Sequence, residues 1–141
     1  MMPDITLSDL VLPNNSGLPH VEFQAKAAIN EESVSGVSID SRSVQAGDVF
    51  IAFSGEHVDG HNYLGQARER GAIAAVVEKE LPVDIPQLVV RDSREALAAI
   101  GRLNRKKFTG PVIAITGSAG KTTCKNIIAA LLSSRYEVCA T

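Results

Sequence analysis

Residues 112–125, VIAITGSAGKTTCK, decide the fold that the sequence predicts. The apolar start of this stretch, residues 112–115, is typical of a buried parallel strand, and a helical pattern begins at Lys121. Between them lie Gly117 and Gly120, which permit backbone angles and close approaches that a Cβ would block. A strand, a glycine turn and a helix N-terminus in this order predict a phosphate cradle, in which backbone N–H groups and the helix dipole face an anion.

The side chains of this loop suit a nucleoside triphosphate. Lys121 can reach the β- and γ-phosphates, which makes it the candidate catalytic residue, and Thr122 can place a hydroxyl on Mg²⁺. The general Walker pattern is not met, because its first glycine falls at the position of Ile115. The chain has the shorter T-G-x-x-G-K-T form, and an ordinary strand-to-helix turn that contains Gly-Lys-Thr is the alternative. The residues predicted to contact ATP are Gly117, Ser118, Ala119, Gly120, Lys121, Thr122 and Thr123.

Composition narrows the class of protein. The chain has 141 residues, of which 45% are hydrophobic and 21% charged, with a formal net charge of −2, so we expect a soluble globular protein that does not bind nucleic acid. No apolar run approaches the roughly 18–20 residues of a membrane span, and the N-terminus lacks the features of a secretory signal. Cys124 and Cys139 are too few for a disulfide scaffold or a zinc site, so we expect a cytoplasmic protein with reduced thiols.

Strands alternate with helices from Val49 onward, which predicts an α/β fold with a parallel or mixed sheet. The domain boundary falls near residues 108–111. We therefore expect a small α/β domain at residues 1–108, and a strand, a glycine loop, a helix and the start of another strand at residues 109–141. The predicted strands are 21–28, 34–39, 49–53, 73–77, 87–90, 112–115 and 136–140, and the predicted helices are 5–12, 62–70, a helix capped by Ser93 and ending near Lys107, and the helix after Gly120.

Two groups of residues resemble one protein family. The first is TGSAGKT with Lys125 shortly after it, and the second is DSR at residues 40–42, followed by GDVF at 47–50 and G-x-x-x-D-G-H at 55–61. Together they resemble the Mur ligases, which are ATP-dependent enzymes that add amino acids to the peptide stem of the peptidoglycan precursor. The resemblance covers about residues 34–125. Ser118 and Lys125 favour the branch that adds D-alanyl-D-alanine over the neighbouring branch that adds the third stem residue.

The resemblance implies a reaction, and it implies that the UDP-linked substrate and ATP bind to different parts of the chain. The first domain is expected to hold the UDP end of UDP-N-acetylmuramoyl-peptide, and residues 109–141 to begin the ATP-binding domain. ATP, with Mg²⁺, would phosphorylate the terminal carboxylate of the substrate to an acyl phosphate, which D-alanyl-D-alanine attacks to form an amide. We expect the chain to be the N-terminal part of a longer, monomeric ligase and to be inactive by itself. The positions that match the substrate-binding residues of the family are Ile39, Ser41, Glu56, His57 and Val58.

Several residues leave alternatives open. Ser41, at a strand end, can offer its hydroxyl to a uracil or phosphate oxygen. Arg42 can pair with phosphate, although a structural ion pair with Asp48 is the preferred interpretation. The alternating His-Asp-His at positions 57, 59 and 61 resembles a metal cluster, but a turn in which Asp59 caps the next helix explains it better. A non-catalytic UDP-sugar-binding module is the alternative to an enzyme.

Overall fold

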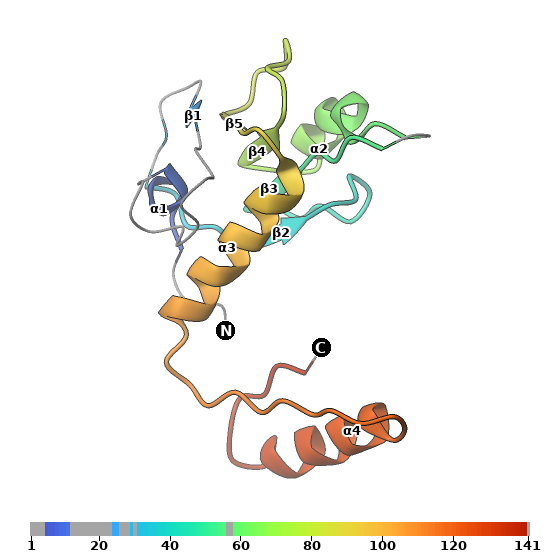
Figure 1. The fold of residues 1–141 in the computed structure, drawn as a ribbon. Helices are drawn as coiled ribbons and strands as arrows, with labels where there is room; N and C mark the ends of the chain where they lie inside the picture. The colour runs from blue at the N-terminus through green and yellow to red at the C-terminus, as the bar shows by residue number, and fades with distance from the viewer. Residues whose placement is uncertain (1–4, 12–23, 26–28, 30, 56–57, 141) are drawn as a thin grey trace. The chain divides into compact units, whose positions relative to one another are not determined.

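The computed structural model describes residues 5–11, 24–25, 29, 31–55 and 58–140. The chain divides into two compact units, Met2–Phe108 and Thr109–Thr141, and each is described here by itself (Figure 1). Parts of the predicted strand at 21–28, all of the segment 12–20, and the site residues Glu56 and His57 lie outside the described residues.

The first unit is built on a five-stranded sheet with the order β1-β5-β4-β3-β2. Strands β2 to β5 run parallel to one another, and β1 pairs antiparallel with β5 at one edge. The sheet is therefore mixed and the fold is α/β, which confirms the predicted class. The strands are β1 (Gln24–Ala25), β2 (Gly36–Ser38), β3 (Asp48–Ile51), β4 (Ala74–Val77) and β5 (Gln87–Val89).

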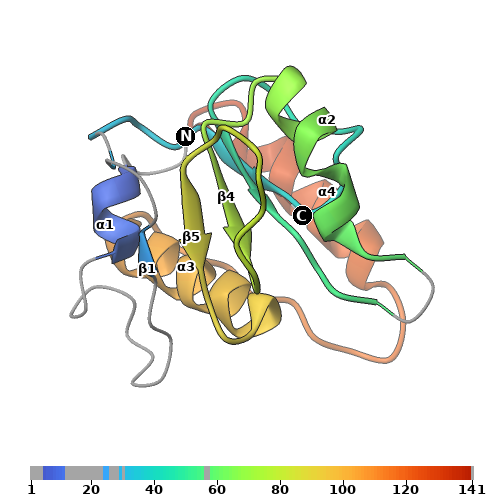
Figure 2. The ribbon, with the colours of Figure 1, turned by 90° about the horizontal axis from the view of Figure 1, so that it is seen from above.

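Helices cover both faces of this sheet. Figure 2 shows α1 and α3 on one side of the strands and α2 on the other. In the part of the chain that the structure describes, no helix is long and apolar enough to cross a membrane. The helices of this unit are α1 (Leu7–Val11), the 3-10 helix η1 (Gly60–Tyr63), α2 (Leu64–Glu69) and α3 (Ser93–Lys107).

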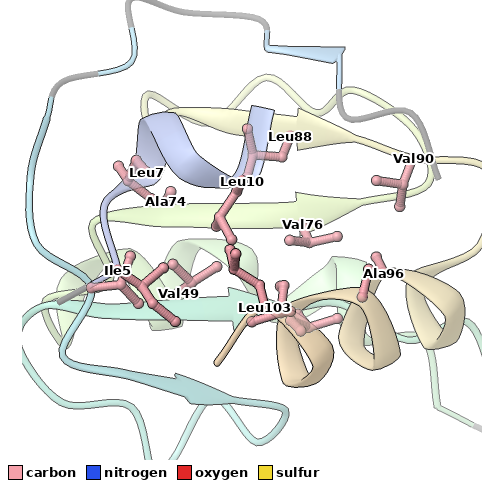
Figure 3. Packing of buried hydrophobic residues seen from close by; sticks show 14 residues of the cluster. Ile5, Leu7, Leu10, Val49, Ala74, Val76, Leu88, Val90, Ala96 and Leu103 are labelled. Carbon is pink, nitrogen blue, oxygen red and sulfur yellow. The ribbon is translucent and has the colours of Figure 1, made fainter. Parts of the chain in front are cut away.

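The two layers of core follow from the alternation of side chains along a strand. In β3, Val49 and Ile51 face the cluster formed with α1 and α3, whereas Phe50 faces the cluster formed with α2. Every residue of β4 is buried, because strands covered on both faces need apolar side chains in both directions. Figure 3 shows the first cluster, to which Leu10 of α1 and Leu103 of α3 both belong.

Capping residues define the helix starts. Asp92, not Ser93, is the N-cap of α3, and its Oδ1 accepts hydrogen bonds from the N–H groups of Arg94 (2.7 Å) and Glu95 (3.1 Å). The prediction of Ser93 was wrong by one residue, because both types cap well and the aspartate stands first. The predicted cap at Asp59 is confirmed, since its carboxylate accepts from the His61 N–H at the start of η1.

An ion pair fastens α1 to the end of α3, since Lys107 Nζ donates to Asp9 Oδ2 over 2.5 Å. The hydrogen bond from Lys107, and then that from the Thr6 N–H, lowers the pKa of Asp9 below its ordinary value. A lowered pKa in the folded state adds stability above the unfolded pKa of about 4, and this contribution is lost as pH falls through the folded value. Asp9→Asn is therefore expected to reduce the free energy of unfolding by about 1 kcal/mol near neutral pH, and by less in acid.

Urea unfolding of Asp9→Asn and the unmodified chain at about pH 7 and about pH 3 measures this difference. Asp84→Asn is the control, because Asp84 also forms an ion pair, with Arg68 at 2.9 Å, but its side chain is 95% exposed. An exposed pair contributes little, so the control should change stability by less than about 0.5 kcal/mol. An Asp9→Asn loss that is equal at both pH values would contradict the ion-pair explanation.

The second unit contains the predicted helix as α4 (Lys121–Leu132). The predicted strands at 112–115 and 136–140 are not formed. A strand is defined by hydrogen bonds to a neighbouring strand, and the described residues offer no partner to either segment. Val112 and Ile113 are consequently more than half exposed, and no residue of α4 is buried.

Candidate functional site

The glycine loop of the second unit leads directly into the N-terminus of α4. Gly120 is the N-cap of α4 in the left-handed conformation (φ 77°), and Gly117 also has a positive φ of 153°. The first helical hydrogen bond runs from the Cys124 N–H to the Gly120 carbonyl at 2.9 Å. The N–H groups of the three residues before Cys124 have no partner within the helix, as at any helix N-terminus. These donors are available to an anion.

The side chains of the loop are accessible. All the residues predicted to contact ATP, from Gly117 to Thr123, are exposed. Lys121 Nζ donates a hydrogen bond to the Gly117 carbonyl, so the lysine lies folded back across the loop. A bound phosphate would compete for that ammonium with a neutral carbonyl, and a charged partner makes the stronger hydrogen bond.

The donor set around the loop fits Mg²⁺ only together with a nucleotide. Among the described residues there is no group of three His, Cys, Asp or Glu side chains that could hold a metal ion by themselves. Mg²⁺ is commonly held by one or two protein oxygens together with substrate phosphates and water. Thr122, the second residue of α4 and exposed, supplies one such oxygen.

The candidate substrate residues of the first unit lie where two parallel strands end. Ile39 and Ser41 follow β2, and Val58 lies in the loop after β3, so the chain brings both segments to the same edge of the sheet. In α/β sheets, this carboxyl edge is the usual place for a ligand. Ile39 and Val58 are 56% and 60% exposed, so both apolar side chains are accessible at this edge.

The turn after β2 is stabilised by an ion pair between two of its own residues. Arg42 Nη2 lies 2.7 Å from Asp40 Oδ2, and the Arg42 N–H donates to Asp40 Oδ1 at 2.9 Å. These hydrogen bonds lower the pKa of Asp40 to about 2. The predicted structural ion pair of Arg42 exists, but its partner is Asp40 and not Asp48. The carboxylate of Asp48 instead accepts from the Gln45 N–H, because the turn at 45–48 folds back on itself.

Ser41 is buried within this turn and bonded to a helix far along the chain. Its hydroxyl donates to Gln66 Oε1 over 2.6 Å, and Gln66 lies on the exposed side of α2. Only 6% of Ser41 remains exposed. The structure therefore adds Gln66 to the candidate site. Sequence analysis missed it, because a glutamine on the polar face of a helix carries no signal of its own.

The residues Asp59 and His61 form a turn and not a metal site. His61 Nε2 accepts a hydrogen bond from the Glu78 N–H at 2.9 Å, so the ring proton is on Nδ1, which lies 2.6 Å from Asp59 Oδ1. Both ring nitrogens are occupied, and the side chain is buried. This arrangement agrees with the preferred interpretation of these two residues.

Glu78 is the second residue that sequence analysis missed. Its carboxylate accepts from the Ser93 N–H at 3.0 Å and from the Ser54 hydroxyl at 2.7 Å. Both hydrogen bonds lower the pKa of Glu78 below its ordinary value, and the one from the Ser93 N–H has the larger effect. Glu78 thus links the ends of β3 and β4 to the start of α3. A carboxylate directly after a buried apolar strand is the sequence signal that could have found it.

Comparison with known proteins identifies the family. A family model described as "Mur ligase family, catalytic domain" matches residues 33–106, just over half of the chain. The UDP-N-acetylmuramoyl-tripeptide–D-alanyl-D-alanine ligase of Escherichia coli K12 is 39% identical over 94% of this chain and 27% of its own length. The UDP-N-acetylmuramoyl-L-alanyl-D-glutamate–2,6-diaminopimelate ligase of Listeria innocua is 37% identical over 85% of this chain and 24% of its own length.

Solved structures of Mur ligases also resemble this chain. A crystal structure of MurF from Acinetobacter baumannii matches 96% of this chain and 29% of its own with a TM-score of 0.77 and 33% identity. The MurF ligase of Thermotoga maritima, solved in complex with ADP, matches 70% of this chain and 23% of its own with a TM-score of 0.57 and 37% identity. The chain spans about a quarter of the length of the curated relatives it matches. On its family model and on its fold, the chain belongs to the Mur ligase family.

Proposed function

We propose that this protein is an ATP-dependent ligase that adds D-alanyl-D-alanine to UDP-N-acetylmuramoyl-tripeptide. The observation that carries the proposal is the glycine loop before α4, with Lys121 as the first helical residue after a left-handed Gly120. A relative that carries the name of this activity is 39% identical over 94% of the chain and supports the same conclusion. Cytoplasmic location and a monomeric state remain part of the proposal.

The residues of the loop would act by holding and orienting phosphate. The N–H groups at the start of α4 and the ammonium of Lys121 would stabilise negative charge on the phosphoryl group that is transferred. Thr122 would hold Mg²⁺, which neutralises charge on the phosphates when bound. The MurF ligase of Thermotoga maritima was solved in complex with ADP, which supports a nucleotide-binding role for this family.

The first unit would hold the UDP end of the substrate at the carboxyl edge of its sheet. Ile39, Ser41 and Val58 lie at that edge, and the two apolar side chains are exposed there. Glu56 and His57 belong to the same proposal on the strength of the sequence alone. Division of the chain at Phe108 supports separate binding of the UDP-linked substrate and ATP.

The branch that adds diaminopimelate is the second candidate, because a relative with that name is 37% identical over 85% of the chain. Ser118 and Lys125 support the D-alanyl-D-alanine branch, as does the TM-score of 0.77 to a MurF structure. The two branches differ in both substrates, so a direct assay separates them.

The assay offers the full-length product of the gene two pairs of substrates, each with ATP. One pair is UDP-N-acetylmuramoyl-tripeptide with D-alanyl-D-alanine, and the other is UDP-N-acetylmuramoyl-dipeptide with diaminopimelate. We expect an amide product, detected by mass spectrometry with equimolar ADP release, from the first pair only. Product from the second pair alone would assign the neighbouring branch. Binding of the UDP compounds without ADP release in either case would favour a non-catalytic module.

A further inference from the structure

One hydrogen bond determines how Ser41 presents its hydroxyl. Ser41 Oγ donates to Gln66 Oε1 over 2.6 Å, although the two residues are 25 positions apart in the chain. The turn that carries Ser41 is held by the pairing of Arg42 with Asp40 and by the hydrogen bond from the Ser43 N–H to the Asp40 carbonyl at 3.0 Å. Because the backbone is held in this way, the orientation of the hydroxyl depends on Gln66.

The bond to Gln66 leaves Ser41 with lone pairs only. A serine hydroxyl has one hydrogen and two lone pairs, whereas a carboxamide oxygen accepts and cannot donate. While its hydrogen is given to Gln66, Ser41 can accept a hydrogen bond from a ligand but does not donate one, which differs from the expectation that its hydroxyl donates to a uracil or phosphate oxygen. A ligand acceptor facing this oxygen would leave two desolvated acceptors without a donor, which is unfavourable.

We propose that Gln66 is a positioning residue that makes Ser41 an acceptor and thereby selects a uracil base over a cytosine base. The inference rests on the proposed function, in which Ser41 lies at the edge of the sheet that holds the UDP end of the substrate, and it takes Ser41 to face the base there. Uracil carries an N–H at ring position 3, whereas cytosine has an unprotonated nitrogen at that position. Ser41 in its acceptor state pairs with the first and opposes the second. The exposed side chain of Ile39, two residues earlier, offers an apolar surface to the face of the base.

Calorimetry of the 141-residue chain with UDP and with CDP measures the selection as the ratio of the two dissociation constants. We expect the unmodified chain to bind UDP about tenfold more tightly than CDP, as one mismatched hydrogen bond allows. Gln66→Leu lets the hydroxyl rotate and donate to the ring nitrogen of cytosine, so the two affinities should become nearly equal. Ser41→Ala should also remove the preference, because neither base then meets a hydroxyl.

Two further variants separate positioning from a general loss of binding. Gln66→Glu keeps an acceptor oxygen at the same place, so the preference for UDP should remain even where its charge weakens both affinities. Glu69→Leu changes another exposed residue of α2 and should leave the ratio unchanged. Gln66→Leu with the same ratio as the unmodified chain, or an unmodified chain that binds CDP as tightly as UDP, would overturn the proposal. A folded chain that binds neither nucleotide would contradict the proposed function itself, and this inference with it.

Discussion

Replacing Lys121 by alanine is expected to lower the turnover of the full-length ligase at least about 100-fold, the usual effect of removing one preorganised group that stabilises developing charge. Lys121 begins α4 beside the left-handed Gly120, and its ammonium already reaches the Gly117 carbonyl across the loop. The loss should appear mainly in kcat, because the phosphoryl group gains charge as it is transferred. ATP affinity should fall less, by about tenfold, which corresponds to one charge-assisted hydrogen bond. Steady-state ADP release and calorimetry with ATP measure the two quantities.

Arg135→Ala is the matched control for this prediction. It removes the same formal charge from the same unit, but from a residue that follows the far end of α4. A helix of that length separates it from the loop, so turnover should stay within about twofold of the unmodified enzyme, since exposed charges more than about 10 Å apart interact weakly. Equal losses in both variants would attribute the effect to net charge, and normal turnover in Lys121→Ala would remove the loop from the mechanism.

Gly71→Ala is expected to destabilise the first unit by about 3 kcal/mol, the sum of a backbone cost and a packing cost. Gly71 follows α2 with a φ of +102°, which an alanine adopts only under strain. A Cβ added there would lie 2.9 Å from Ala46 Cα, a backbone atom that cannot rotate away. The Gly71 carbonyl also accepts from the Gly47 N–H at 3.1 Å, so a shift of either segment breaks a second contact.

Gly65→Ala, within α2 itself, is expected to have the opposite effect on stability. Gly65 lies inside α2, and a Cβ added to it meets nothing within 4 Å. Alanine is the better helix former, so this variant should gain up to about 1 kcal/mol. Urea unfolding, followed through the amide signals of β3 and β4 by nuclear magnetic resonance, measures both variants. A Gly71→Ala chain as stable as the unmodified one would show that the two turns adapt to the added methyl group.

The kind and order of the elements in the first unit were predictable, because the signals are local. The apolar runs that became β3 and β4 need nothing beyond their own residues to indicate strands buried on both faces. The predicted helix 62–70 stops directly before Gly71, a glycine that tolerates the positive φ with which the chain leaves a helix. The exact residue at which an element begins was less predictable, as the N-cap of α3 at Asp92 instead of Ser93 shows.

The partners of individual side chains were not predictable in this way. Arg42 has two aspartates within reach along the sequence, and only the folded turn decides for Asp40. Glu78 directly follows β4 in the sequence, but its bonds to Ser54 and to the Ser93 N–H depend on how three strand ends meet. The segment 112–115 shows the same limit for the backbone, since an apolar run becomes a strand only where another strand pairs with it.

Residue types at short spacing along the chain were enough to establish the α/β class, the glycine loop with Lys121 and Thr122, and the family. The strand order, with β1 antiparallel at the edge, and the hydrogen bond that joins Ser41 to Gln66 required the folded chain. Both bring together residues that are far apart in the chain. Their pairing follows from burying two apolar faces of one sheet at once, and no local pattern records which distant residues that packing places side by side.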